Sequence, residues 1–308
     1  MRRLAARLCS AGVTLVGISL GVFLLLHLVP GDPVDVMLGE RAAPADREAL
    51  RNALGLSVDP LTAASRYFTR LAQGDLGISL HSREPIAPLL LARAPATLQL
   101  ACAALLMAVA LALPLGILSA RWAGRWPDRL TAAFAALGAA VPGFVLGPLL
   151  ILAFAVQLGW LPVAGAGTPA GLVLPACTLA LGMAAILSRQ LRVALLGVFH
   201  EPYLRAARAR GLDARTVLWR HALRNAAIPV LTVLGMQLGA LLGGAVITET
   251  VFAWPGLGSL TLEAIERRDY PLLQGCVLVI SASYLAVNVL TDMALAWCDP
   301  RLRTLTRA

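Results

Sequence analysis

Several residues of this chain have side chains that catalyse reactions or bind metals in other proteins, but their spacing does not build a site. His200 and Glu201 begin a zinc-protease pattern. Leu204 stands where that pattern needs its second histidine, and Pro202 interrupts the helix that would carry both ligands. The segment 256–259, Gly-Leu-Gly-Ser, lacks the strand-to-helix setting of a nucleophilic serine. The four histidines fall in separate segments, at His27, His81, His200 and His221. We therefore expect neither a metal site nor an enzyme.

The basic residues of the chain are all arginines, because the sequence contains no lysine. The phosphate-binding loop of ATPases needs a lysine that reaches the terminal phosphates of ATP. If ATP drives a process in which this chain takes part, another polypeptide must bind the ATP and its Mg²⁺. We expect no cofactor in this chain.

The most distinctive polar stretch extends from residue 201 to residue 225, where arginines interrupt an otherwise apolar sequence. Pro202 suits the first turn of a helix, and Gly211 suits the left-handed residue that ends one. Asp213 is placed to cap a second helix from Ala214 onward. The spacing predicts two short helices that meet at a glycine and form a rigid elbow for a soluble partner to grip. A second interpretation stays open, in which the basic stretch rests on anionic lipid headgroups.

The composition is that of a protein embedded in a bilayer. Hydrophobic residues make up 58% of the 308 residues, charged residues 14%, and the mean hydropathy is +0.77. A spanning helix needs roughly 20 mostly apolar residues, and six runs satisfy this: 8–29, 97–120, 130–158, 172–188, 228–250 and 273–297. We expect an all-α membrane protein with six transmembrane helices. It divides into a first transmembrane helix (1–30), an extracytoplasmic segment (31–95) and a helical core (96–308) that contains the cytoplasmic loop 192–227.

The orientation follows from the arginines, because loops rich in positive charge stay in the cytoplasm. Arginines outnumber acids before the first span, in 121–129, in 189–224 and after residue 300. Both termini and the basic stretch are therefore expected on the cytoplasmic side of the membrane, and segment 31–95 on the outside. These loops account for the net charge of +9, so we expect contact with membrane lipid and no nucleic-acid partner.

Small residues and prolines predict close contacts and a break within the helical core. Gly235, Gly239 and Gly243 recur every fourth residue and favour tight packing, either against a second subunit or against a helix of the same chain. Pro142-Gly143 predicts a kink that faces protein. Further helices are predicted for 46–56 and 60–72. Glu249 is interpreted as an anchor at the membrane surface in preference to a cavity carboxylate.

The basic stretch resembles the EAA loop of importer-type ABC transporter permeases, whose pattern is Glu-Ala-Ala, three residues, Gly, nine residues and Ile-x-Leu-Pro. The residues that match are Ala206, Ala207, Gly211 and Leu223; those that replace the glutamate, isoleucine and proline are Arg205, His221 and Arg224. The replacements are similar to the variant in the peptide and nickel permease family, Ala-Arg-Ala-Arg-Gly-Leu at 207–212 and His-Ala-Leu-Arg-Asn-Ala at 221–226. Other segments similar to signatures of that family follow in order at 30–33, 74–77, 95–98, 248–258, 268–271 and 299–301.

This resemblance implies the first permease subunit of an ATP-driven, binding-protein-dependent importer that moves di- or oligopeptides across the bacterial cytoplasmic membrane. Nickel and glutathione are the alternative substrates of the same fold. The implied partners are a second homologous permease, two cytoplasmic ATPase subunits and an external substrate-binding protein. The elbow would lie in a groove of an ATPase, with docking residues Arg205, Ala206, Ala207, Gly211, Leu212, Asp213, His221 and Leu223.

Two points remain open beside this resemblance. Because Arg205 stands where the general pattern has an acid, we expect an acidic or carbonyl-lined groove in the partner. From the residues alone, a secondary transporter driven by an ion gradient is the alternative, and it predicts carboxylates at mid-depth and an inverted repeat.

Overall fold

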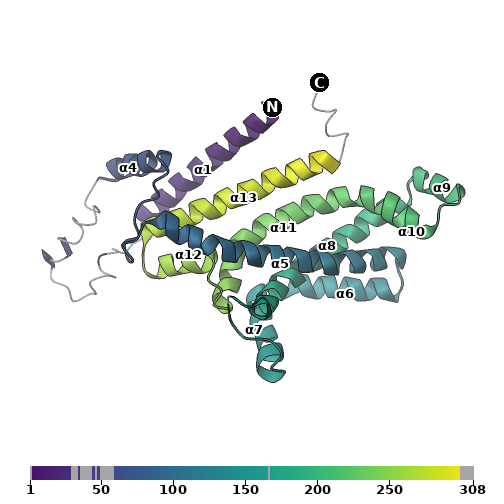
Figure 1. The fold of residues 1–308 in the computed structure, drawn as a ribbon. Helices are drawn as coiled ribbons and strands as arrows, with labels where there is room; N and C mark the ends of the chain where they lie inside the picture. The colour runs from purple at the N-terminus through teal and green to yellow at the C-terminus, as the bar shows by residue number, and fades with distance from the viewer. Residues whose placement is uncertain are drawn as a thin grey trace. The chain divides into compact units, whose positions relative to one another are not determined.

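The computed structural model describes residues 2–28, 59–165 and 167–298, together with positions 34, 44, 45, 47 and 48. Over these residues the chain is helical, with one isolated bridge between Ile78 and Pro85 (Figure 1). The prediction of an all-α protein is therefore confirmed. The helices are α1 (Arg2–Leu28), α4 (Pro60–Ala72), α5 (Ile86–Arg121), α6 (Trp126–Ala140), α7 (Gly143–Leu150), α8 (Pro169–Phe199), α9 (Pro202–Ala209), α10 (Ala214–Thr216), α11 (Leu223–Val251), α12 (Leu257–Glu266) and α13 (Tyr270–Cys298), with π-helical segments η1 (Ile151–Gln157) and η2 (Val217–Ala222).

Three described helices, α5, α8 and α13, are long and apolar enough to cross a membrane, and the number rises to five if each of two bent helix pairs is one span. Within α1, the apolar stretch Ser10–Leu24 is shorter than these helices. Six spans and cytoplasmic termini remain predictions. The predicted helix 46–56 falls almost entirely outside the described residues, as do the segments 30–33 and 299–301.

Two compact units make up the chain, and the first combines Met1–Thr97 with Pro255–Ser283. Its core joins the start of α5 to α12 and the start of α13, through Ile86, Leu90, Leu257, Leu260, Ala264, Leu272 and Cys276. Helix α4 has the predicted bounds, because Asp59 caps it by accepting a hydrogen bond from the N–H of Leu61 at 3.2 Å.

The second unit combines Leu98–Trp254 with Tyr284–Ala308. Within it α5, α6, α8 and α11 run alongside one another, and α9 and α10 lie at one end of this bundle (Figure 1). Small side chains bring the helices close: Ala104, Ala108 and Ala112 of α5 join Ala180 and Ala184 of α8 in one buried cluster. Apolar helices gain no hydrophobic driving force from one another in lipid, so close backbone approach through alanine and glycine holds such a bundle together.

The predicted kink at Pro142-Gly143 is a sharp break. Helix α6 ends at Ala140, α7 begins at Gly143, and the axis of α6 differs by 104° from that of α7 together with η1 (Gly143–Gln157). Proline interrupts the hydrogen-bond ladder, which explains the position of the break. Pro142 and Gly143 at the break are exposed in the chain, so a kink that faces protein remains a prediction. In α7 the contact is made by Gly147, which is buried and whose Cβ position lies 3.2 Å from the ring of Phe252.

Candidate functional site

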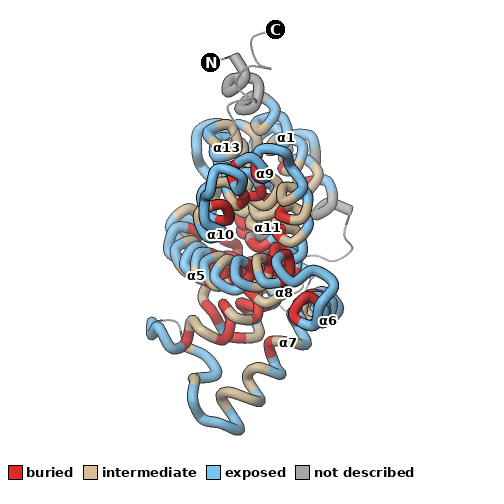
Figure 2. Tube along the Cα trace, turned by 90° about the vertical axis from the view of Figure 1, so that its right-hand side faces the viewer, coloured by how far each residue is buried: buried red, intermediate tan, exposed pale blue. Residues whose placement is uncertain are grey.

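Helix α9 forms the first arm of the predicted elbow, which is defined here as residues 201–226. Pro202 occupies its first turn. On its inner side Leu204 is fully buried and Ala207 is 8% exposed. The other residues of α9 are exposed, among them Arg205 and Arg208, as the colouring of Figure 2 shows. The helix therefore has an apolar side for its own chain and a basic side that is open to a partner.

The turn between the two arms depends on Gly211, whose φ of 83° lies in the left-handed region. The N–H of Gly211 donates to the carbonyl of Arg208 at 3.0 Å, and that of Leu212 donates to the carbonyl of Ala207 at 3.3 Å, which closes the end of α9. A Cβ placed on Gly211 would meet no atom within 4 Å. Glycine is therefore required by the backbone angle and not by a lack of space.

The second arm begins at Asp213, whose carboxylate accepts a hydrogen bond from the N–H of Thr216 at 3.2 Å. Hydrogen bonds from Thr216 lower the pKa of Asp213 below its ordinary value. Helix α10 then continues into the wider turn of η2, a type of segment that often occurs at functional sites. Val217 and Leu218 of η2 are buried, whereas the indole of Trp219 is 58% exposed.

Both arms pack on one apolar surface of the second unit, which we call the seat. The seat consists of Ala120 of α5 with Leu191 and Leu195 of α8, each no more than 4% exposed. The elbow residues in this cluster are Leu204, Ala207, Val217, Leu218, Ala222 and Ala226. Full burial of one leucine contributes about 1.5–3 kcal/mol, so the two arms are held on α8 and α5 as a single body.

A hydrogen bond also ties the arms to each other. The side-chain amide of Asn225, just beyond the second arm, donates to the hydroxyl of Tyr203 on the first arm at 2.5 Å. The guanidinium of Arg205 donates to the carbonyl of His200 at 3.1 Å, before the first arm. The contact between Asn225 and Tyr203 limits how far the arms separate, and the contact from Arg205 joins α9 to the end of α8.

The outward side of the elbow, which we call the outer face, is basic with two large apolar side chains. Leu212 is 40% and Trp219 58% exposed. The arginines exposed on the elbow are Arg205, Arg208, Arg210, Arg215, Arg220 and Arg224. An open hollow of about 570 Å³ lies beside Arg215, Trp219 and Arg220. Such a surface suits a protein partner with acidic groups around an apolar patch.

The sequence did not predict an ion pair close to the seat, in which the carboxylate is buried and the guanidinium side chain is 32% exposed. The carboxylate of Asp128, in the first turn of α6, accepts two hydrogen bonds from Arg192 of α8, from Nε at 2.6 Å and from Nη2 at 2.8 Å. It also accepts from the hydroxyl of Ser119 on α5 at 2.5 Å and from the N–H of Gly124 at 2.8 Å. One carboxylate thus joins α5, α6, α8 and the turn between α5 and α6. The only signal in the sequence was the scarcity of acids among the basic loops.

Comparison with known proteins adds the family. The family described as binding-protein-dependent transport system inner membrane component matches residues 112–304, which include the elbow and its seat. The N-terminal region of the membrane component of such systems matches residues 1–101. The chain belongs to this family. It is therefore a multi-pass inner-membrane permease subunit of an ABC importer, as the resemblance implied.

The relatives of the permease span nearly its whole length. The glutathione transport system permease protein GsiC of Escherichia coli (strain K12) is 40% identical over 290 residues, which are 94% of this chain and 95% of the relative. GsiC from Escherichia coli O6:H1 (strain CFT073) is 41% identical over the same shares. GsiC of Shigella boydii serotype 4 (strain Sb227) is 40% identical over these shares as well.

Two solved structures share the fold of the permease. An inward-facing structure of the MetNI methionine ABC transporter has a TM-score of 0.60 at 20% identity and covers 70% of this chain and 99% of its own. An amino acid ABC transporter crystallised with histidines has a TM-score of 0.51 at 19% identity, and covers 70% of this chain and 94% of its own. At these identities the likeness shows the fold alone.

The predicted docking residues of the permease do not all lie on one side of the elbow. Exposed residues are Arg205, Ala206, Gly211, Leu212 and Asp213. Ala207 is buried in the seat, and His221 and Leu223 are half-buried. The exposed residues are open to a partner, and docking at them remains a prediction, while Ala207 packs α9 against the seat.

Two glycines of the predicted ridge pack within the permease. A Cβ on Gly235 would clash with Thr291 of α13, and a Cβ on Gly239 would lie 2.5 Å from the ring of Tyr284 of α13. At Gly235 and Gly239 the ridge therefore packs against a helix of the same chain, which was one of the two predicted alternatives. Gly243 is exposed with nothing within 4 Å of its Cβ position, so a contact with a second permease remains a prediction at this residue.

The interpretation of Glu249 as a surface anchor is wrong. Its side chain is fully buried, whereas an anchor at the level of the lipid headgroups must be exposed. Its backbone carbonyl accepts a hydrogen bond from the N–H of Trp254 at 2.7 Å, in the turn that follows α11. The sequence placed Glu249 correctly near the end of a span but did not show which side it faces.

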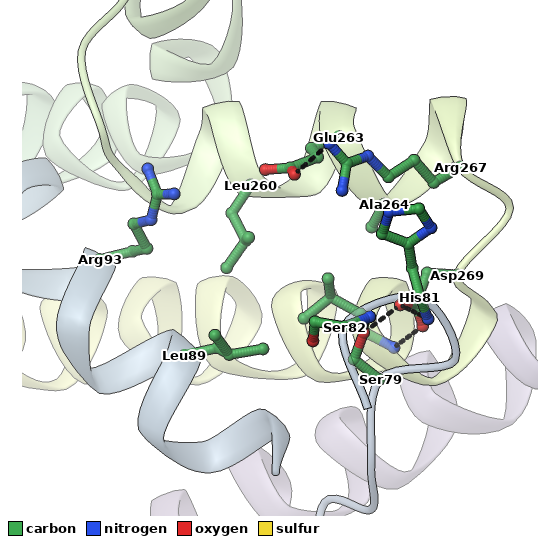
Figure 3. A pocket seen from close by; sticks show the side chains of 11 residues that line it. Ser79, His81, Ser82, Leu89, Arg93, Leu260, Glu263, Ala264, Arg267 and Asp269 are labelled. Atoms are coloured by element: carbon green, nitrogen blue, oxygen red, sulfur yellow. Dashed lines mark hydrogen bonds and ion pairs between the residues drawn. The ribbon is translucent and has the colours of Figure 1, made fainter. Parts of the chain in front are cut away.

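A small cavity of about 100 Å³ lies in the first unit, between α5, α12 and the start of α13 (Figure 3). Asp269 at its inner side is 1% exposed and accepts hydrogen bonds from the hydroxyl of Ser79 at 2.5 Å and from the N–H of His81 at 3.2 Å. Glu263 and Arg267 form an ion pair at 3.1 Å above it. The side chains that line the cavity include both charged and apolar groups.

Proposed function

We propose that this permease takes part in the uptake of small peptides, with the tripeptide glutathione as the first candidate. The observation that carries the proposal is the likeness to permeases of glutathione transport systems, at 40–41% identity over 94% of the chain. Dipeptides and longer peptides share the amide backbone and charged termini of glutathione, so they belong to the same candidate class. Nickel, the other substrate implied by the resemblance, has no specific observation in its favour.

The importer is proposed to contain a second homologous permease, two cytoplasmic ATPase subunits and an external substrate-binding protein. The absence of lysine from the sequence supports a separate ATPase, since this chain cannot form the phosphate-binding loop. The outer face of the elbow supports the place of contact, because its arginines surround exposed Leu212 and Trp219 while its inner side is fixed on the seat. ATPase closure would then displace the elbow and, through the seat, α8 and α5.

Uptake by the reconstituted importer tests this function. The permease, its partner permease and the ATPases are placed in liposomes with the ATPase side outward, the binding protein is enclosed, and efflux into the medium of labelled glutathione, dialanine or Ni²⁺ from the lumen is followed after addition of ATP. We expect ATP-dependent movement of glutathione that ionophores leave unchanged. Movement that follows an ion gradient without ATP contradicts the proposal, and movement of Ni²⁺ alone contradicts the peptide class.

A further inference from the structure

The ion pair between Asp128 and Arg192 lies directly beside the seat of the elbow. Ser119, which donates to Asp128, precedes the seat residue Ala120 in α5, and Arg192 follows the seat residue Leu191 in α8. Gly116 of α5 permits this close approach, since a Cβ on it would lie 2.9 Å from the Cβ of Leu191. The polar contact and the apolar seat therefore join the same two helices, α5 and α8, at adjacent residues.

The geometry of the pair suits orientation more than stability. Asp128 is 6% exposed, whereas the side chain of Arg192 is 32% exposed, so solvent screens part of the attraction between the two charges. The two parallel hydrogen bonds from Arg192, however, fix the angle between the guanidinium and the carboxylate plane. The other two donors, Ser119 and Gly124, complete the bonding of both carboxylate oxygens. The contact therefore fixes the start of α6 relative to α8 and α5.

We propose that Asp128 and Arg192 are positioning residues that clamp the seat, so that displacement of the elbow moves α5, α6 and α8 together. This inference rests on the proposed ATP-driven uptake and extends it to a specific pair of side chains. Without the clamp, α5 and α8 shift relative to each other at the seat, and the motion of the elbow is lost before it reaches the start of α6. In this role the pair contacts no substrate and acts only through the helices that it joins.

The first test measures the clamp in the purified permease itself. Hydrogen–deuterium exchange of peptides from 199–226 is compared for the unaltered chain, for Asp128→Asn and for Arg192→Lys, with Arg189→Lys as the matched control. Arg189 is exposed and lies on the same helix, three residues before Arg192. We expect faster exchange in the elbow for both clamp variants and no change for the control. Unchanged exchange in both clamp variants overturns the proposal.

The second test measures transmission in the assembled importer, as substrate moved per ATP hydrolysed. A variant that merely folds less well lowers both quantities together and leaves their ratio constant. Loss of a coupling contact lowers the ratio, and we expect a decrease of about fivefold or more for Asp128→Asn. The double variant Asp128→Asn with Arg192→Gln should be no worse than the more damaging single change, since the pair acts as one unit.

The two proposals fail in different ways. If the unaltered importer moves none of the tested substrates with ATP, the proposed function is wrong, and the exchange measurement still decides whether the clamp holds the elbow. If the unaltered importer works and Asp128→Asn leaves the ratio constant, the clamp is wrong and the function stands. Should Asp128→Asn not accumulate in the membrane, Arg192→Lys, which keeps the charge but loses the paired donors, replaces it in both measurements.

Discussion

Replacing Gly211 isolates the turn of the elbow from everything else in the permease. A left-handed backbone costs an ordinary residue about 1–2 kcal/mol. Because a Cβ at Gly211 would meet nothing within 4 Å, this backbone cost is the whole effect of Gly211→Ala. Where alanine lets the free elbow leave the turn that docking needs, affinity for the ATPase subunits should fall by a factor of up to about 5–30.

The assay is titration of the purified ATPase subunits onto the permease pair in nanodiscs, with three variants. Gly211→Ala should show the loss above, and Gly211→Asn a smaller loss, since asparagine tolerates the left-handed region better. Gly197→Ala is the matched control, because Gly197 is helical and its Cβ position is also open. Equal affinities for Gly211→Ala and Gly197→Ala would refute the reasoning, as would equal losses for alanine and asparagine at Gly211.

Three further predictions address the seat, the helix contacts and the cap. Leu204→Ala should lower the stability of the permease by about 2–5 kcal/mol, since the side chain is fully buried. Leu212→Ala should leave the melting temperature unchanged and weaken ATPase binding. The reverse pattern would contradict the assignment of Leu204 to the inner side of the elbow and Leu212 to its outer face. Gly239→Ala should disrupt α11–α13 packing and lower the yield of folded permease. Gly243→Ala should fold normally and lose the second permease in co-purification, and retention of the second permease would contradict a contact at Gly243. The pKa of Asp213 is lowered in the folded chain, so its stabilisation of the second arm is present above the ordinary pKa of an aspartate and disappears as the pH falls through the lowered value. Hydrogen–deuterium exchange in residues 213–222, corrected for intrinsic rates, should therefore rise in acid for the unaltered chain. For Asp213→Ala the corrected exchange should be independent of pH in this range.

Local features of the sequence predicted local structure well. Helix α4 has the predicted bounds because Asp59 and Pro60 begin it by short-range chemistry. The elbow was also predictable, since Gly211 and Asp213 specify a helix end and a helix start within three residues of each other. The break between α6 and α7 followed from Pro142 for the same reason.

Partners far apart in the chain could not be predicted. Asp128 and Arg192 are 64 residues apart, and Ser79 and Asp269 are 190 apart. Nothing near either residue in the sequence specifies its partner, because the pairing follows from how whole helices pack. Helix packing also decides which neighbour a glycine faces. The spacing of Gly235, Gly239 and Gly243 therefore did not show that Gly239 lies against Tyr284 of α13.

The central claim is that the outer face of the elbow contacts the ATPase. The most direct measurement is photo-crosslinking from a benzophenone amino acid at Leu212 in the assembled importer, with Leu61 on α4 as the control because its side chain is 80% exposed. We expect an adduct between the permease and an ATPase subunit from Leu212 and none from Leu61. Adducts from Leu212 to lipid or to the permease alone, in an importer that hydrolyses ATP, would contradict it.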